Sequence, residues 1–106
     1  MAALFFVALV PGVAGAEHSC DQLDELKSHK SHKPSRVQFL NGADGERLVK
    51  WLDFHGTPVT FKRLKPNQSI LQSTYIGHPW MVTDRTGKCR EIVVPTQKSQ
   101  KVKITR

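Results

Sequence analysis

The chain has few acidic residues, few cysteines and no long apolar run. Its 106 residues contain 9 Asp and Glu against 16 Lys and Arg, which gives a formal net charge of +7 at pH 7. Because the two cysteines form no CxxC motif, we expect neither a redox centre nor a cysteine-based metal site. The longest apolar run, Ala2–Val10, is shorter than the roughly 20 residues that a membrane-spanning helix needs. We therefore expect one small domain without a membrane span, a metal or a cofactor.

Residue sets typical of catalysis are also lacking. The available acid–base groups are Asp53, His55, His78 and Asp84, but none stands in a spaced motif with a nucleophile or a set of metal ligands. The doubled Ser-His-Lys unit over residues 28–33 offers two histidines without a third ligand, which is a weak basis for a metal site. The sequence therefore predicts a protein that is not an enzyme.

Residues 1–16 have the pattern of a secretory signal peptide. An apolar run is broken by Pro11-Gly12 and is followed by the small residues Ala14-Gly15-Ala16, which are typical of a cleavage site. The alternative is an apolar N-terminal helix or anchor. Residues 17–33 are polar and predict a linker with a short helix. The expected location of the protein is secreted and extracellular.

Export would have two chemical consequences. Cys20 and Cys89 would enter an oxidising compartment, where an intramolecular disulfide is favoured over two free thiols or an intermolecular bridge. Closing such a long loop stabilises the fold by about 4 kcal/mol in the chain-entropy model. Asn67-Gln68-Ser69 would become a usable glycosylation sequon in an expected loop. A glycan on Asn67 is expected close to the candidate ligand site, where it would narrow access.

From Pro34 onward, short apolar runs alternate with turn signals. The expected strands are Arg36–Asn41, Arg47–Phe54, Val59–Lys62, Ser69–Tyr75, Trp80–Thr83, Glu91–Val94 and Gln100–Thr105. The second of these is apolar on both faces, which is typical of a covered central strand. Seven short strands with this spacing predict an all-β, seven-stranded β-sandwich over residues 34–106.

The segment Ser73–Trp80 concentrates the candidate ligand-binding side chains. If the strands on either side of the turn Ile76–Pro79 pair with each other, Thr74, His78 and Trp80 would share one rim of a sheet. A hydroxyl and an imidazole can hold a ligand hydroxyl from two sides, while an indole supplies a flat apolar wall. The alternative is an ordinary aromatic core with the histidine in a turn.

Several motifs add a family resemblance to this pattern. They are Pro34-Ser35-Arg36-Val37, Trp51-Leu52-Asp53-Phe54-His55-Gly56, Leu64-Lys65-Pro66, Tyr75-Ile76-Gly77-His78-Pro79-Trp80 and Glu91-Ile92-Val93-Val94-Pro95. Over roughly Pro34 to Thr105 the chain resembles the β domain of the von Hippel–Lindau tumour suppressor family. This resemblance implies a seven-stranded sandwich that captures a hydroxyproline, as the family does in a peptide of hypoxia-inducible factor.

The resemblance also implies roles for five residues. The family's serine and histidine that bond the hydroxyproline hydroxyl correspond to Thr74 and His78, and its indole wall corresponds to Trp80. Phe61 replaces a family tyrosine, and Ser73 replaces a second histidine. The family's separate helical domain, which recruits ubiquitin-ligase components, has no counterpart in this sequence, so we do not expect a ligase-receptor role to transfer.

The expected function is therefore a secreted, non-enzymatic module that binds extended peptides or proteins, hydroxyproline-containing peptides among them. A basic extracellular domain that binds polyanions beside a degenerate pocket is an alternative, because the excess of Lys and Arg attracts anionic partners. Nucleic acid is not expected, since no arginine-rich aromatic platform is present. If the N-terminus is retained, an intracellular substrate-recognition adaptor is a further alternative.

Overall fold

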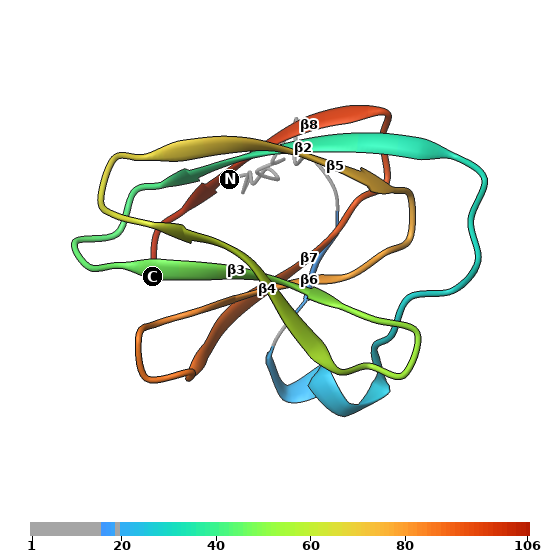
Figure 1. Ribbon diagram of the computed structural model, residues 1–106, viewed down its shortest axis with the longest axis horizontal. Coiled ribbons are helices and arrows are strands. Elements are labelled where there is room, and N and C mark those ends of the chain that lie inside the picture. Colours follow the sequence, from blue (N-terminus) through green and yellow to red (C-terminus); the bar gives the residue numbers. More distant parts are fainter. Residues whose placement is uncertain (1–15, 19) are drawn as a thin grey trace, which may run out of the picture.

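The computed structural model describes residues 16–18 and 20–106, which form two packed β-sheets (Figure 1). One sheet has the strand order β1-β7-β6-β3-β4 and the other the order β5-β2-β8. The elements are β1 (Ala16–His18), the 3₁₀ helix η1 (Cys20–Glu25), β2 (Pro34–Asn41), β3 (Arg47–Leu52), β4 (Pro58–Leu64), β5 (Ser69–Tyr75), β6 (Trp80–Thr83), β7 (Cys89–Val94) and β8 (Ser99–Ile104).

This architecture confirms the expected all-β sandwich, with β2 to β8 as its seven strands. The short strand β1 adds an edge beside β7 in a segment that the sequence predicted as a linker. The expected signal peptide lies outside the described residues apart from its last residue, Ala16, which begins β1.

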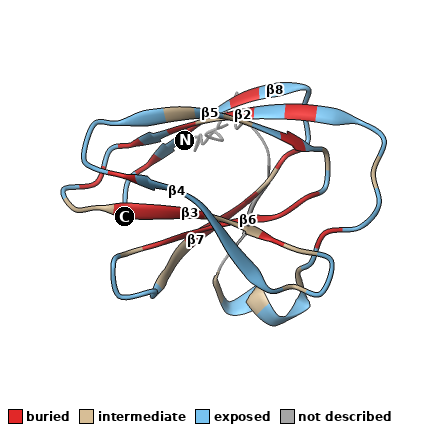
Figure 2. Cartoon of the chain, viewed as in Figure 1, coloured by how far each residue is buried: buried red, intermediate tan, exposed pale blue. Residues whose placement is uncertain are grey.

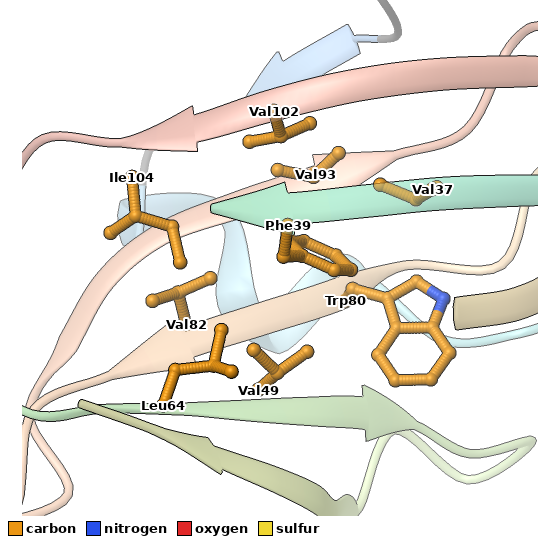
Figure 3. Packing of buried hydrophobic residues seen from close by; sticks show 9 residues of the cluster. All are labelled: Val37, Phe39, Val49, Leu64, Trp80, Val82, Val93, Val102 and Ile104. Carbon is orange, nitrogen blue, oxygen red and sulfur yellow. The ribbon is translucent and has the colours of Figure 1, made fainter. Parts of the chain in front are cut away.

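The main core lies between the two sheets. In β2 the side chains alternate, so that Val37 and Phe39 are buried while Arg36 and Leu40 face solvent, as the two-residue period of a strand requires. Both sheets contribute to one buried cluster, drawn in Figure 3, of Val37, Phe39, Val49, Leu64, Trp80, Val82, Val93, Val102 and Ile104. Trp80 thus belongs to the core as well as to the candidate site.

A second, smaller core covers the other face of the five-stranded sheet. Leu52, Met81 and Ile92 are buried there, and Leu23 and Leu26 pack against them. Figure 1 shows η1 on the side of this sheet that faces away from the three-stranded sheet. Strand β3 lies between β6 and β4 and is covered on both faces, which explains why its sequence is apolar on both faces.

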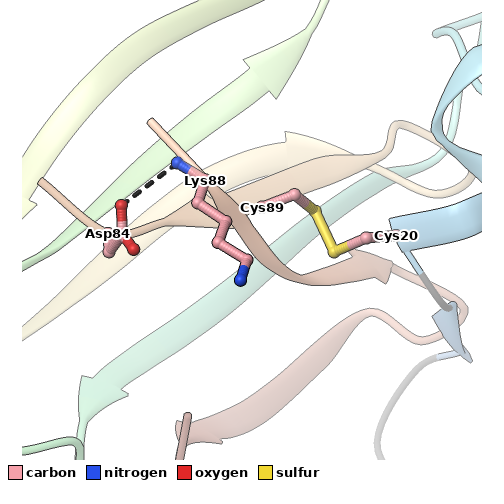
Figure 4. Close-up of a disulfide and its surroundings, with 4 residues drawn as sticks. All are labelled: Cys20, Asp84, Lys88 and Cys89. Atoms are coloured by element: carbon pink, nitrogen blue, oxygen red, sulfur yellow. Dashed lines mark hydrogen bonds between the residues drawn. A yellow bond between two sulfur atoms is a disulfide. The ribbon is translucent and has the colours of Figure 1, made fainter. Parts of the chain in front are cut away.

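A disulfide between Cys20 and Cys89 holds η1 against the five-stranded sheet (Figure 4). It joins the first residue of η1 to the first residue of β7, across a sequence separation of 69 residues. The predicted intramolecular pairing is confirmed. The bridge therefore ties the N-terminal segment to the sheet.

The turn Ile76–Pro79 crosses from one sheet to the other. Strand β5 pairs with β2, whereas β6 pairs with β3 and β7, so the expectation that β5 and β6 pair across this turn is wrong. The physical reason is that Thr74 and Trp80 are both buried and face each other from opposite sheets. Gly77, with a φ of 91°, takes the left-handed conformation that the crossing requires.

Candidate functional site

An open cavity of about 260 Å³ lies where this turn crosses the end of the sandwich. It is lined by Trp51, Phe54, Phe61, Ser73, Thr74, Tyr75, His78 and Trp80. These residues come from β3, β4, β5, β6 and two connecting loops. The five ligand-binding residues expected from the sequence all line this one cavity, although the hairpin that was expected to join them does not form.

Three aromatic rings surround the imidazole of His78. Trp51 is stacked on it with ring centroids 5.9 Å apart, and Phe54 meets it edge-on at 5.6 Å. Tyr75 lies at 5.4 Å in a tilted arrangement. The imidazole is 6 % exposed, so these rings hold it in a fixed orientation. The sequence analysis did not assign Trp51, Phe54 or Tyr75 to the site, although all three lie in the motifs that carry the family resemblance.

Phe61 forms the opposite wall of the cavity. Its ring meets Trp80 edge-on at 5.1 Å and Trp51 at 6.3 Å. Val49 pairs with Lys62 and Lys50 pairs with Thr60, so Phe61 is the extra residue of a β-bulge in β4. Bulges redirect side chains next to functional sites, and this one explains how a residue of an edge strand reaches the cavity.

The rim of the cavity is unusually apolar for a surface. Phe54 and Phe61 are each 49 % exposed, and Tyr75 is 43 % exposed. The accessible wall of the cavity is almost wholly apolar, so the polar atoms of the site are recessed beneath the rings. Exposed aromatic clusters of this kind mark binding sites on soluble proteins. The cavity is smaller than the roughly 300–1,000 Å³ of drug-sized sites, and it suits a single side chain.

The hydroxyl of Thr74 is oriented by Trp80. The indole Nε1–H of Trp80 donates to Oγ1 of Thr74 at 2.9 Å, and both residues are buried. Since this bond uses a lone pair of the oxygen, the hydroxyl proton of Thr74 remains free to donate. The sequence placed both residues at the site but did not reveal that they bond to each other.

The imidazole of His78 is oriented by the backbone of His29. Its Nε2 lies 2.9 Å from the carbonyl oxygen of His29, 49 residues away in the sequence. A carbonyl oxygen only accepts, so Nε2 carries a proton in this contact. In the neutral imidazole, Nδ1 is then an acceptor. Thr74 and His78 therefore bring one hydrogen-bond donor and one acceptor to the same apolar cavity.

The position of Phe54 depends on a turn built by Asp53. Oδ1 of Asp53 accepts hydrogen bonds from the backbone N–H groups of His55 at 2.8 Å and Thr57 at 2.9 Å. The N–H of Thr57, followed by that of His55, lowers the pKa of this carboxyl group below its usual range. Asp53 and the backbone of His55 thus serve the turn.

Comparison with known families fits this geometry. Residues 26–97 match the family model of the VHL (von Hippel–Lindau) beta domain. The chain belongs to this family. VHL β domains are substrate-recognition modules that bind peptides and proteins, and they are a binding fold rather than a catalytic one. Comparison with curated proteins gave no match.

Two other expectations concern the surroundings of the site. Asn67 is exposed in the β4–β5 turn with a φ of 70°, whereas Thr74 lies near the opposite end of β5. Seven residues of extended chain span about 20 Å, so Asn67 lies farther from the cavity than expected, and narrowed access by a glycan there stays a prediction. Within residues 16–18 and 20–106, no helix is long and apolar enough to cross a membrane.

Proposed function

We propose that this VHL β domain is a secreted module that binds extended peptides and takes a hydroxylated proline ring into the aromatic cavity. The observation that carries the proposal is that Thr74 and His78 line one apolar cavity, Thr74 with a hydroxyl proton that its bond to Trp80 does not use and His78 with the ring nitrogen that its bond to His29 leaves over. A ligand hydroxyl both donates and accepts, so one such group would satisfy both residues at once. The apolar carbons of the ring that bears the hydroxyl would lie against Trp80 and Phe61.

The preference for a hydroxylated ring follows from the cost of leaving these polar atoms unpaired. An unhydroxylated ring would displace water from Thr74 and His78 without replacing its hydrogen bonds. Each buried polar group left without a partner costs about 1–3 kcal/mol, and sites built around a ligand hydroxyl reject the analogue that lacks it. Phe61 stands where the family has a tyrosine, and Ser73 stands where it has a second histidine. These two replacements remove polar contacts around the ring, but they leave Thr74 and His78 in place.

The peptide backbone has a natural place beside β4. This strand ends the order of the five-stranded sheet, and its residues are exposed from Pro58 to Arg63 (Figure 2). An edge strand can pair with an extended peptide through main-chain hydrogen bonds, while pockets select its side chains. Because Phe61 belongs to β4 and also lines the cavity, a peptide along this edge would pass directly over the site.

The test compares two peptides that differ only in one ring hydroxyl. A labelled single-hydroxyproline peptide, too short to form a triple helix, and its proline twin are titrated with the mature protein by fluorescence anisotropy. We expect the hydroxylated peptide to bind at least about tenfold more tightly. Equal affinities would show that the protein does not recognise the hydroxyl. If neither peptide binds, the cavity is not a site for such peptides.

Two substitutions at one position sharpen this test. Thr74→Val keeps the shape but loses the hydroxyl, and it should abolish the preference for hydroxyproline. Thr74→Ser keeps the hydroxyl and should retain the preference, which makes it the matched control. Thermal unfolding of both variants separates a lost contact from a lost fold.

Export is the second part of the proposal. It is supported by the signal-like pattern of residues 1–16 and by the disulfide, since such bridges persist in oxidising compartments. Mass spectrometry of the protein from its native source should show an N-terminus at Glu17 and two fewer hydrogens than the reduced chain. A retained Met1 with both cysteines reduced would instead support an intracellular substrate-recognition adaptor.

A further inference from the structure

The three-stranded sheet carries exposed cations but no carboxylate. Strands β2, β5 and β8 contain no Asp or Glu, so the three-stranded sheet has no carboxylate of its own. Four exposed cations lie along the seam between β2 and β8: Arg36 in β2, Lys101 and Lys103 in β8, and Lys98 just before β8. We call these four residues the basic seam.

The pairing of β2 with β8 sets the spacing of the basic seam. The two strands run parallel, with Arg36 opposite Ser99, Gln38 opposite Lys101 and Leu40 opposite Lys103. Side chains on one face of a strand recur about every 6.6 Å, and neighbouring strands lie about 4.8 Å apart. The backbone N–H of Arg36 donates to the carbonyl of Lys98 at 3.0 Å, and both residues line one hollow.

Among the residues that the structure describes, the cations of the basic seam form no ion pair with a carboxylate. The ion pairs among the described residues join Arg63 and Arg85 to Glu46, and Arg90 to Asp84, all outside the three-stranded sheet. Arg63, Arg85 and Arg90 are thus partly neutralised, whereas the four cations of the seam are not. Its four side chains are all exposed.

Two shallow hollows follow one another along the seam. The first, of about 450 Å³, is lined by Pro34, Ser35, Arg36, Ser73, Lys98 and Ser99. The second, of about 290 Å³, is lined by Gln38, Leu40, Ser69, Lys101, Val102 and Lys103. Each hollow therefore combines two cations with hydroxyl or amide groups, and neither contains a carboxylate.

We infer that the basic seam binds a linear sulfated polysaccharide that runs along β2 and β8. Sulfate groups carried at intervals on such a chain would meet the paired cations, and its sugar hydroxyls would meet the serines and Gln38. Single-stranded nucleic acid fits less well, because it needs aromatic platforms for its bases, and the described residues of β2 and β8 expose no aromatic side chain. This inference does not depend on the proposed peptide, although Ser73 lines both the first hollow and the aromatic cavity.

The test uses heparin as the probe and two charge-matched double variants. Lys101→Gln/Lys103→Gln removes two cations of the seam, and Lys27→Gln/Lys88→Gln removes two exposed cations elsewhere. Affinity for a short heparin oligosaccharide is measured by calorimetry at several salt concentrations. We expect the seam variant to bind about tenfold more weakly with a smaller salt dependence, and the control to bind within about twofold of the wild type.

Three results would overturn the inference. Equal weakening by both double variants would mean that heparin responds to net charge alone. Absence of heparin binding at moderate salt would remove the site altogether. Tighter binding to single-stranded DNA or to vesicles of anionic lipid than to heparin would assign the seam to a different class of partner. Thr74→Val should leave heparin binding unchanged, so the seam and the peptide cavity can fail or succeed separately.

Discussion

The indole N–H of Trp80 in β6 donates to the hydroxyl of Thr74 in β5, and this bond joins the two sheets at the end of the sandwich. It is both a structural contact and part of the candidate site. Because both residues are buried, loss of either partner leaves a polar atom without a hydrogen bond in the core. Stability and ligand recognition are therefore coupled at this position.

The coupling can be measured by a double-mutant cycle. Thr74→Val should lower the free energy of unfolding by about 1–3 kcal/mol, because it leaves the indole N–H unpaired. In a Trp80→Phe background that N–H is already gone, so the same change should cost much less. Urea unfolding of the wild type, both single variants and the double variant checks this. Additive effects would show that the bond does not stabilise the fold.

Restoring the family tyrosine should strengthen peptide binding. Phe61 is half exposed at the cavity rim, so Phe61→Tyr adds a hydroxyl without burying it, and the free energy of unfolding should change by less than about 0.5 kcal/mol. One added hydrogen bond is worth about 0.5–1.5 kcal/mol, or about two- to tenfold in affinity for the hydroxyproline peptide. Phe54→Tyr, at an equally exposed rim position, is the control. Equal gains from both variants would contradict a specific contact at Phe61.

Breaking the disulfide should destabilise η1 and the smaller core before it destabilises the main core. Cys20→Ser/Cys89→Ser removes a cross-link whose chain-entropy contribution is about 4 kcal/mol, and it releases η1 from its sheet. Hydrogen exchange should rise in residues 20–28 and at Met81 and Ile92 before it rises in Val37 and Phe39. The wild type under reducing conditions should behave in the same way. Uniform exchange across both cores would show that the bridge acts on the whole fold.

Acid should destabilise the β6–β7 hairpin. Asp84 accepts hydrogen bonds from the hydroxyl and N–H of Thr86 and from the N–H of Lys88, the last of which is drawn in Figure 4. The hydroxyl of Thr86 is the main cause that holds the pKa of this carboxyl far below its usual value of about 3.9. Since the folded pKa is the lower one, the stabilisation is complete above about pH 5 and is lost as the pH falls below about 4.

The free energy of unfolding of Asp84→Asn at two pH values tests whether the stabilisation by Asp84 is lost as the pH falls. The variant should be less stable than the wild type at about pH 6, and the difference should shrink at about pH 2, because the carboxyl group of the unfolded wild type is protonated there. Asp44→Asn, in the exposed β2–β3 turn, is the matched control and should change little at either pH. A constant difference between Asp84→Asn and the wild type would mean that charge at Asp84 does not matter.

The fold class, the seven strands β2 to β8 and a favoured Cys20–Cys89 disulfide could be predicted from the sequence alone, whereas strand β1 was missed. Alternating burial in β2 and β8 follows directly from their two-residue periodicity, and the two apolar faces of β3 indicated its central place. Gly87, at a φ of 91°, marked the β6–β7 hairpin. The strand periodicities and the turn at Gly87 are local features, because each depends on the order of neighbouring residues.

Only the tertiary structure decided how the site is assembled. The sequence suggested a hairpin through Ile76–Pro79, but that turn crosses between sheets, because the burial of Thr74 and Trp80 from opposite sides outweighs local strand pairing. The carbonyl of His29 that orients His78 comes from 49 residues away, and no periodicity predicts such a contact. The bulge that directs Phe61 into the cavity depends on the register with β3, and register is a property of the assembled sheet.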